Sequence, residues 1–170
     1  METDFASTLR VANDDKFFYM EFSQKITTAD LLIVESITCN DEVEVMFAKQ
    51  KAQPYRCYYN GPSGLIMANS YGEQAGRQNI PAREFGHPWF HAVYKSDISA
   101  PDRWTMRWAF PLDWITSEPV KPGETLYMNL ASVIGKKANH GYHPRLGIFT
   151  LTSGTSVKTT DRMAEIKLAK

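Results

Sequence analysis

The chain has 170 residues, of which 43% are hydrophobic and 12% aromatic, enough to build the core of one domain without disulfide bonds. Nineteen basic and nineteen acidic side chains cancel, which argues against general electrostatic attraction to nucleic acid or to an anionic membrane. No apolar run reaches membrane-spanning length, and no signal peptide is recognised at the N-terminus. We therefore predict one domain over residues 1–170 that neither binds nucleic acid nor inserts into a membrane.

Short strands separated by turns are predicted along the chain, with little helix. A hairpin is expected around the Asn-Asp-Asp-Lys turn at residues 13–16, and a second around the Asn-Gly-Pro-Ser-Gly turn at residues 60–64. The roughly ten predicted strands cover residues 8–11, 17–22, 42–48, 55–59, 65–70, 90–94, 104–110, 126–133, 146–152 and 163–168. Short strands at this spacing indicate an all-β fold, a single antiparallel β-sandwich of jelly-roll type with long loops.

Three segments do not fit the strand pattern. Residues 30–37 suit either a short helix or another strand, whereas residues 71–88 and 135–144 read as long loops. Loops of that length in a compact domain are commonly functional or mobile. Binding residues are therefore sought in these loops as well as on the strands.

Residues 104–110 show the clearest alternation in the chain. Trp104, Met106, Trp108 and Phe110 share one face, and the residues between them are smaller or polar. This pattern predicts a strand whose aromatic face packs in the core rather than an exposed aromatic platform. Pro111 lacks a backbone N–H and is expected to end the strand.

Five motifs follow one another in order along the chain. They are Asp-Glu-Val-Glu-Val-Met-Phe at 41–47, Tyr-Tyr-Asn-Gly-Pro-Ser-Gly at 58–64, the strand that ends at Pro111, Pro-Gly at 122–123 with Asn129 after it, and His-Pro-Arg-Leu-Gly at 143–147. Their order and spacing resemble those of the family 9 carbohydrate-binding modules, a DOMON-like class of β-sandwich. The resemblance implies a non-catalytic module, extracellular or periplasmic, that binds a polysaccharide or oligosaccharide, chain ends included, and works beside a linked or associated glycoside hydrolase.

The resemblance also implies site residues. Modules of this family clamp a terminal sugar between two tryptophans, while carboxylates and amides hydrogen-bond the hydroxyls. Glu44 and Asn129 stand at matching positions and are expected to bind the glycan. Thr38 lies where one clamp tryptophan is expected, and Ser132 replaces an arginine of the family pattern. Arg107 replaces a glutamate, so we expect it to change specificity.

Four further contacts are predicted from loop composition alone. Aromatic rings stack on sugars, and cationic or imidazole groups donate hydrogen bonds to hydroxyls. These candidates are Arg77, Trp89, Tyr142 and His143.

A structural calcium ion is the cofactor that the resemblance suggests. Calcium prefers hard oxygen ligands, which Asp14, Asp15 and Asp41 could supply. The chain has no His-Glu-x-x-His zinc pattern.

No enzymatic motif is present, since the chain lacks a Gly-x-Ser-x-Gly elbow, a phosphate loop and a dinucleotide fingerprint. Two alternatives to glycan binding remain. One is a structural accessory domain of a larger carbohydrate-active enzyme, with no sugar site of its own. The other is a haem-binding DOMON relative, for which Met46, Met67, Met106 and Met128 offer axial ligands.

Overall fold

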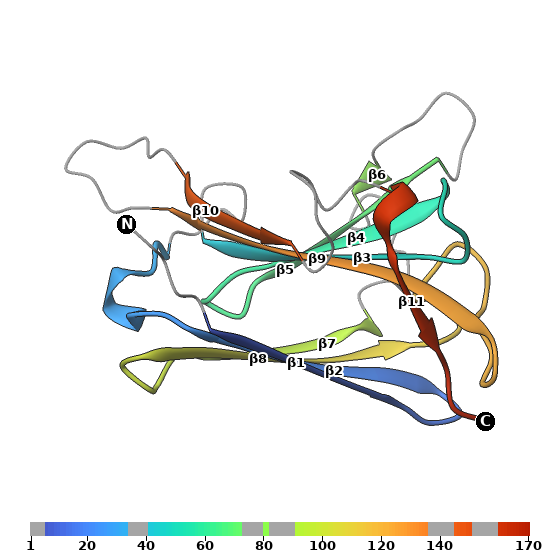
Figure 1. The fold of residues 1–170 in the computed structure, drawn as a ribbon, viewed down its shortest axis with the longest axis horizontal. Helices are drawn as coiled ribbons and strands as arrows, with labels where there is room; N and C mark the ends of the chain where they lie inside the picture. The colour runs from blue at the N-terminus through green and yellow to red at the C-terminus, as the bar shows by residue number, and fades with distance from the viewer. Residues whose placement is uncertain (1–5, 34–40, 73–79, 82–90, 136–144, 151–159) are drawn as a thin grey trace.

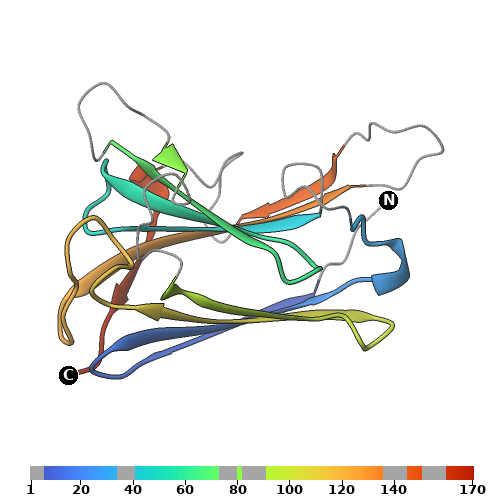
Figure 2. The ribbon, with the colours of Figure 1, turned by 180° about the vertical axis from the view of Figure 1, so that it is seen from behind.

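The computed structural model describes residues 6–33, 41–72, 80–81, 91–135, 145–150 and 160–170. These residues form two antiparallel sheets that lie face to face as two layers (Figures 1 and 2). The described residues contain no α-helix, and the 3-10 turns that are described in full are Thr28–Asp30 and Thr160–Arg162. The all-β sandwich expected from the sequence is therefore confirmed.

The smaller sheet has four strands in the order β1-β2-β8-β7. Their bounds are Ser7–Asn13 for β1, Phe17–Lys25 for β2, Arg103–Pro111 for β8 and Val93–Asp97 for β7. The predicted 13–16 hairpin joins β1 to β2, and the predicted stop at Pro111 is the last residue of β8.

The larger sheet has seven strands, and its main path runs β10-β9-β3-β4-β5-β6 while β11 pairs with β9. The bounds are Arg145–Thr150 for β10, Thr125–Gly135 for β9, Glu42–Ala48 for β3, Tyr55–Asn60 for β4, Ile66–Tyr71 for β5, Ile80–Pro81 for β6 and Ala164–Lys167 for β11. Strand β3 has the predicted bounds without change.

Two sequence expectations are corrected by the pairing. Ile80–Pro81, expected within a loop, forms a two-residue strand against β5, at a sheet edge where proline is tolerated. The strand expected at 90–94 begins at Val93, where pairing with Ala109 starts. Of the ambiguous segment 30–37, residues 34–40 lie outside the described residues, and Thr28–Asp30 just before it forms a 3-10 turn.

The core lies between the sheets and is rich in aromatic rings. Trp104 and Phe110 are 0% exposed and Trp108 is 3% exposed, which confirms the predicted core face of β8. Phe47, from the opposite sheet, packs edge-on against Phe110 with ring centroids 4.8 Å apart. This interlocking of rings from both sheets fixes how the two layers face one another.

Buried polar groups also join the sheets. The indole Nε1 of Trp108 on β8 donates to Asn60 Oδ1 on β4 at 2.8 Å, and Asn60 Nδ2 donates to the Val43 carbonyl at 2.9 Å. Near the 60–64 turn, Trp104 Nε1 donates to Ser96 Oγ at 2.9 Å, whose hydroxyl donates to the Pro62 carbonyl at 2.7 Å. The Asn and Trp of the sequence motifs are thus partners across the core.

Candidate functional site

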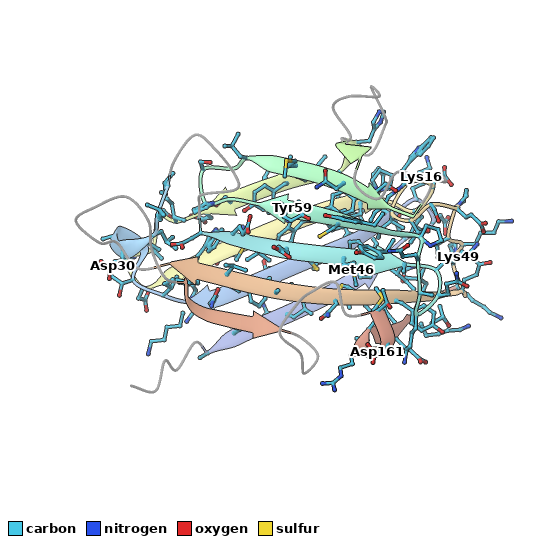
Figure 3. All side chains as sticks on the ribbon, turned by 90° about the horizontal axis from the view of Figure 1, so that it is seen from above. Lys16, Asp30, Met46, Lys49, Tyr59 and Asp161 are labelled. Carbon is cyan, nitrogen blue, oxygen red and sulfur yellow. The ribbon has the colours of Figure 1, made fainter. Side chains whose placement is uncertain are left out.

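The face of the seven-stranded sheet that points away from the core carries a second buried cluster, which we call the tyrosine face. It gathers side chains from β3, β4, β5 and β9, together with Met163 (Figure 3). Its buried members are Met46, Ala48, Tyr55, Cys57, Tyr59, Tyr71, Ala131 and Met163. Glu42 is 4% exposed on this side, so the face is not the open polar surface that the alternation of β3 suggests.

Strand register brings Glu44 and Asn129 together on the tyrosine face. Glu44 lies between Ala131 on β9 and Tyr59 on β4, and Asn129 lies opposite Met46, two residues along β3 from Glu44. Diagonal neighbours of this kind are about 7–8 Å apart. The two residues that match the family pattern therefore share one face of the sheet, with Glu44 half-buried and Asn129 1% exposed.

Two residues of β5 add hydrogen-bonding groups to the same face. The hydroxyls of Tyr59 and Tyr71 are 2.7 Å apart, and the Tyr71 ring stacks on Tyr55 with centroids 4.8 Å apart. Asn69 lies one strand beyond Cys57, and its buried Oδ1 has no hydrogen-bond partner in the described part of the chain. A buried amide oxygen without a partner is a ready acceptor for a ligand hydroxyl.

These tyrosines and Asn69 were not predicted from the sequence to be site residues. The signal was present in the alternation at residues 55–59 and 67–71, which puts Tyr55, Cys57 and Tyr59 on one side of β4. The alternation does not show which strand lies beside β4, so it could not show that these tyrosines share a face with Glu44.

Burial changes the acidity of the phenols. It raises the pKa of Tyr55 to about 12, with smaller contributions from Tyr71 and Cys57. Burial is also the main cause of a raised pKa at Tyr59, to which Cys57, Tyr71 and the Glu44 carboxylate add. Both phenols therefore keep their protons at neutral pH and remain hydrogen-bond donors.

We expect the free energy of unfolding to fall as the pH rises above about 10, where tyrosines of the unfolded chain lose their protons. Folded Tyr55 and Tyr59 resist ionisation because their pKa values are raised, so the stability they contribute is full below that pH and is lost above it. Urea unfolding between neutral and alkaline pH checks this. The double variant Tyr55→Phe/Tyr59→Phe should show a shallower decline, and an unchanged decline would contradict the assignment.

Arg107 lies far from Glu44 and Asn129. It projects from the outer face of β8 in the four-stranded sheet, where its Nε donates to Glu21 Oε2 at 2.8 Å. The whole core separates this face from the tyrosine face, because packed sheets alone stand about 10 Å apart. The predicted contacts therefore divide between two surfaces of the sandwich.

Ser132 points into the core rather than toward a ligand. Its hydroxyl donates to Gln24 Oε1 on β2 at 2.6 Å, and both residues are buried. At the position where the family pattern has arginine, this chain thus has a hydrogen bond between the sheets. The predicted residues Thr38, Arg77, Trp89, Tyr142 and His143 lie outside the described residues.

The three aspartates proposed for calcium are not brought together. Asp14 lies in the turn before β2, where its Oδ1 accepts from the Lys16 and Phe17 amides, both at 2.8 Å, and these bonds lower its pKa. Asp41 accepts from the amide of Leu32, which follows β2 in the chain, whereas Asp14 precedes β2. The strand between them is about 30 Å long. Among the described residues, no group of three or more His, Cys, Asp or Glu side chains is arranged to hold a metal ion.

Comparison with known proteins identifies the fold. A family 9 carbohydrate-binding module from Caldicellulosiruptor kristjanssonii in complex with glucose matches with a TM-score of 0.67 and 12% identity, over 99% of this chain and 78% of that one. The cellotriose complex of a module of this family from the same organism matches with a TM-score of 0.67 and 12% identity, over 99% of this chain and 77% of that one. A Bacteroides uniformis protein assigned as carbohydrate-binding matches with a TM-score of 0.56 and 11% identity, over 76% of this chain and 63% of that one.

These matches define the chain as a β-sandwich with the fold of the family 9 carbohydrate-binding modules, as the sequence motifs suggested. At the level of sequence, no family model and no curated protein matches the chain. Among the described residues no helix is long and apolar enough to cross a membrane.

Proposed function

We propose that this protein is a non-catalytic carbohydrate-binding module that binds a glycan at the tyrosine face. The observation that carries the proposal is the meeting of Glu44 and Asn129, the two residues matching the family pattern, on one face of one sheet. The hydroxyls of Tyr59 and Tyr71 lie on that same face, as does the Asn69 amide oxygen, which has no hydrogen-bond partner among the residues that the structure describes.

The chemistry available there is mainly hydrogen bonding. Carboxylate, amide and phenol groups match the mixed donors and acceptors of a sugar. Glu44 and Met67 are half-buried, whereas Tyr59 and Tyr71 are each 8% exposed, so a ligand would approach through Glu44 and Met67. The described tyrosine rings do not form an open stacking platform. The aromatic contact of the proposed site is assigned to Trp89 and Tyr142, with Arg77 and His143 as polar partners.

The wider setting of the module follows from the same proposal. A glycan-binding domain outside the cytoplasm, linked to or associated with a glycoside hydrolase, raises the local concentration of that enzyme on its polysaccharide. We also propose that the module binds the ends of glycan chains. A structural calcium ion is a further part of the proposal.

Replacing Glu44 by Gln should weaken glycan binding by about 1–3 kcal/mol, because a neutral amide replaces a carboxylate that accepts hydroxyl hydrogen bonds. The measurement is calorimetric titration with a panel that includes glucose and cellotriose, with and without calcium. Glu118→Gln is the matched control, since the Glu118 side chain is 76% exposed and belongs to none of the strands that build the tyrosine face.

Unchanged affinity in a folded Glu44→Gln variant would remove Glu44 from the site. Absence of binding across the whole panel would favour the structural accessory domain instead. The burial of Tyr55, Tyr59 and Tyr71 is the observation that fits that second function, because a buried apolar cluster stabilises a domain without needing a ligand.

A further inference from the structure

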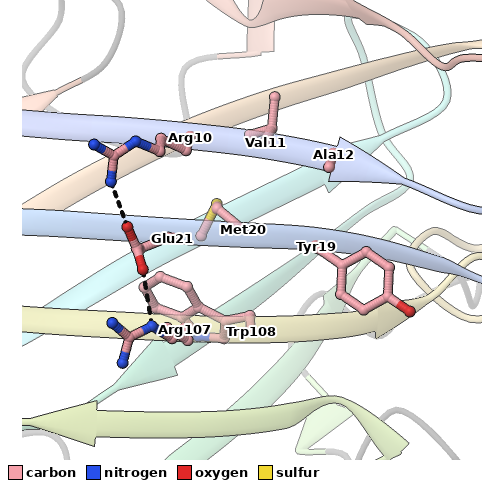
Figure 4. A pocket seen from close by; sticks show the side chains of 8 residues that line it. All are labelled: Arg10, Val11, Ala12, Tyr19, Met20, Glu21, Arg107 and Trp108. Carbon is pink, nitrogen blue, oxygen red and sulfur yellow. Dashed lines mark hydrogen bonds and ion pairs between the residues drawn. The ribbon is translucent and has the colours of Figure 1, made fainter.

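An open hollow of about 490 Å³ lies on the outer face of the four-stranded sheet (Figure 4). The tyrosine face belongs to the other sheet and points to the opposite side of the molecule. We call it the arginine–tyrosine groove. Strand register sets two rows of side chains across it. Arg10, Glu21 and Arg107 form one row, and Tyr19 stands in the next row between two alanines.

The charged row holds two guanidinium groups around one carboxylate. Glu21 accepts from Arg10 Nη1 at 2.7 Å and from Arg107 Nε at 2.8 Å. The Arg107 guanidinium first, and that of Arg10 second, hold the pKa of Glu21 below its usual range, so the carboxylate stays ionised. Lys95 follows Arg107 in register on β7, which leaves the row with a net positive charge.

The arginines keep hydrogen-bonding capacity for a ligand. Within the described part of the chain, their only side-chain hydrogen bonds are those to Glu21, and each guanidinium has five N–H donors. The side chains of Arg10 and Arg107 are 71% and 56% exposed. Exposed ion pairs contribute little to the stability of a fold, so stabilising the sheet does not account for this row of charges. Glu21 instead holds both guanidinium groups in fixed positions.

Tyr19 supplies a flat apolar surface beside this row. It is 38% exposed, and its pairing partners across the sheet, Ala12 and Ala109, are too small to cover the ring. Its hydroxyl donates to Asp14 Oδ2 at 2.7 Å, which holds the ring in place. Tyr19 and Glu21 are two residues apart on one face of β2, about 7 Å along the strand.

We propose that the arginine–tyrosine groove binds a carboxylated sugar, with the sugar ring against Tyr19 and its carboxylate on Arg107 and Arg10. A planar guanidinium binds a carboxylate through paired hydrogen bonds, and an aromatic ring packs against the apolar face of a sugar ring. Glu21 lies between the arginines and accepts from sugar hydroxyls. An acidic peptide side chain has a carboxylate but no hydroxyl to donate to Glu21, so the mixed groove favours a uronate.

The test is titration of the intact protein with trigalacturonate, and with cellotriose as a neutral counterpart, at low ionic strength. Arg107→Gln and Arg10→Gln should each weaken trigalacturonate binding about tenfold or more. Arg103→Gln is the matched control, because Arg103 is an exposed cation on the same strand and the same face. Tyr19→Ala should weaken binding as well, while Tyr19→Phe, which keeps the ring, should lose less.

Several results would overturn the proposal. An equal loss in Arg103→Gln would show general attraction to a basic surface, and a tighter complex with pentaglutamate would show a site for acidic peptides. No binding of trigalacturonate to the unmodified protein would also reject it.

The glycan site on the tyrosine face is independent of this groove, so Glu44→Gln should leave trigalacturonate binding unchanged. If the unmodified protein binds trigalacturonate but not cellotriose, the result counts against the glycan site on the tyrosine face and not against the groove. Thermal unfolding of each variant checks that it is folded.

Discussion

Replacing Asn60 by Ala should lower the free energy of unfolding by about 3–4 kcal/mol. The substitution leaves the Trp108 indole N–H without its acceptor and the Val43 carbonyl without the Asn60 donor, both inside the core. Each buried polar group left without a partner costs about 1–3 kcal/mol. Urea unfolding of the variant and the unmodified protein measures the difference.

Asn13→Ala is the matched control for Asn60. The Asn13 side chain also makes hydrogen bonds to the backbone, with the amide and carbonyl of Ala169, but in an exposed setting where water replaces them. We expect a loss of about 1 kcal/mol or less there. A similar small loss at Asn60 would show that the core relaxes to satisfy Trp108. A double-mutant cycle with Trp108→Phe then measures the coupling itself.

Replacing Phe47 by Ala should lower the free energy of unfolding by about 3–5 kcal/mol. Phe47 is 0% exposed and contacts rings from both sheets, with centroid distances of 4.8 Å to Phe110, 5.7 Å to Phe18 and 6.1 Å to Tyr58. Its removal would leave a cavity between two rigid layers that cannot close around it. Denaturant unfolding of the variant gives the value.

Phe17→Ala separates this effect from the loss of any aromatic ring. Phe17 is half-buried on the outer face of β2 and lies 6.0 Å from the Tyr19 ring, so its loss leaves no enclosed cavity. We expect a cost of about 1 kcal/mol for it. Equal losses at both positions would contradict the central place given to Phe47.

Local alternation explains why the strands could be predicted. Side chains in a strand point to opposite faces in turn, so the pattern in residues 104–110 specifies both a strand and its buried face. Glu42–Ala48 was predicted with its final bounds for the same reason. The fold followed from the order of such strands and turns, and the structural matches to family 9 modules agree with it.

The two hairpins, β1–β2 and β4–β5, were predicted from their turns, but no local pattern encoded which strands distant in the chain become neighbours. Arg10, Glu21 and Arg107 meet only because β8 pairs with β2, across more than eighty residues of chain. Glu44 and Arg107 were expected at one glycan site, yet their strands belong to different sheets. The second buried cluster likewise depends on β4 and β5 placing tyrosines beside β3.

The sequence by itself therefore determined the class of fold, the core face of each strong strand and the presence of Glu44 and Asn129 on strands. The tertiary structure decided which of these residues share a surface. Hydrophobic alternation reports only which side of a strand is buried, whereas a binding site requires side chains from several strands in one register. Long-range pairing between strands sets that register, and it is a property of the whole folded chain.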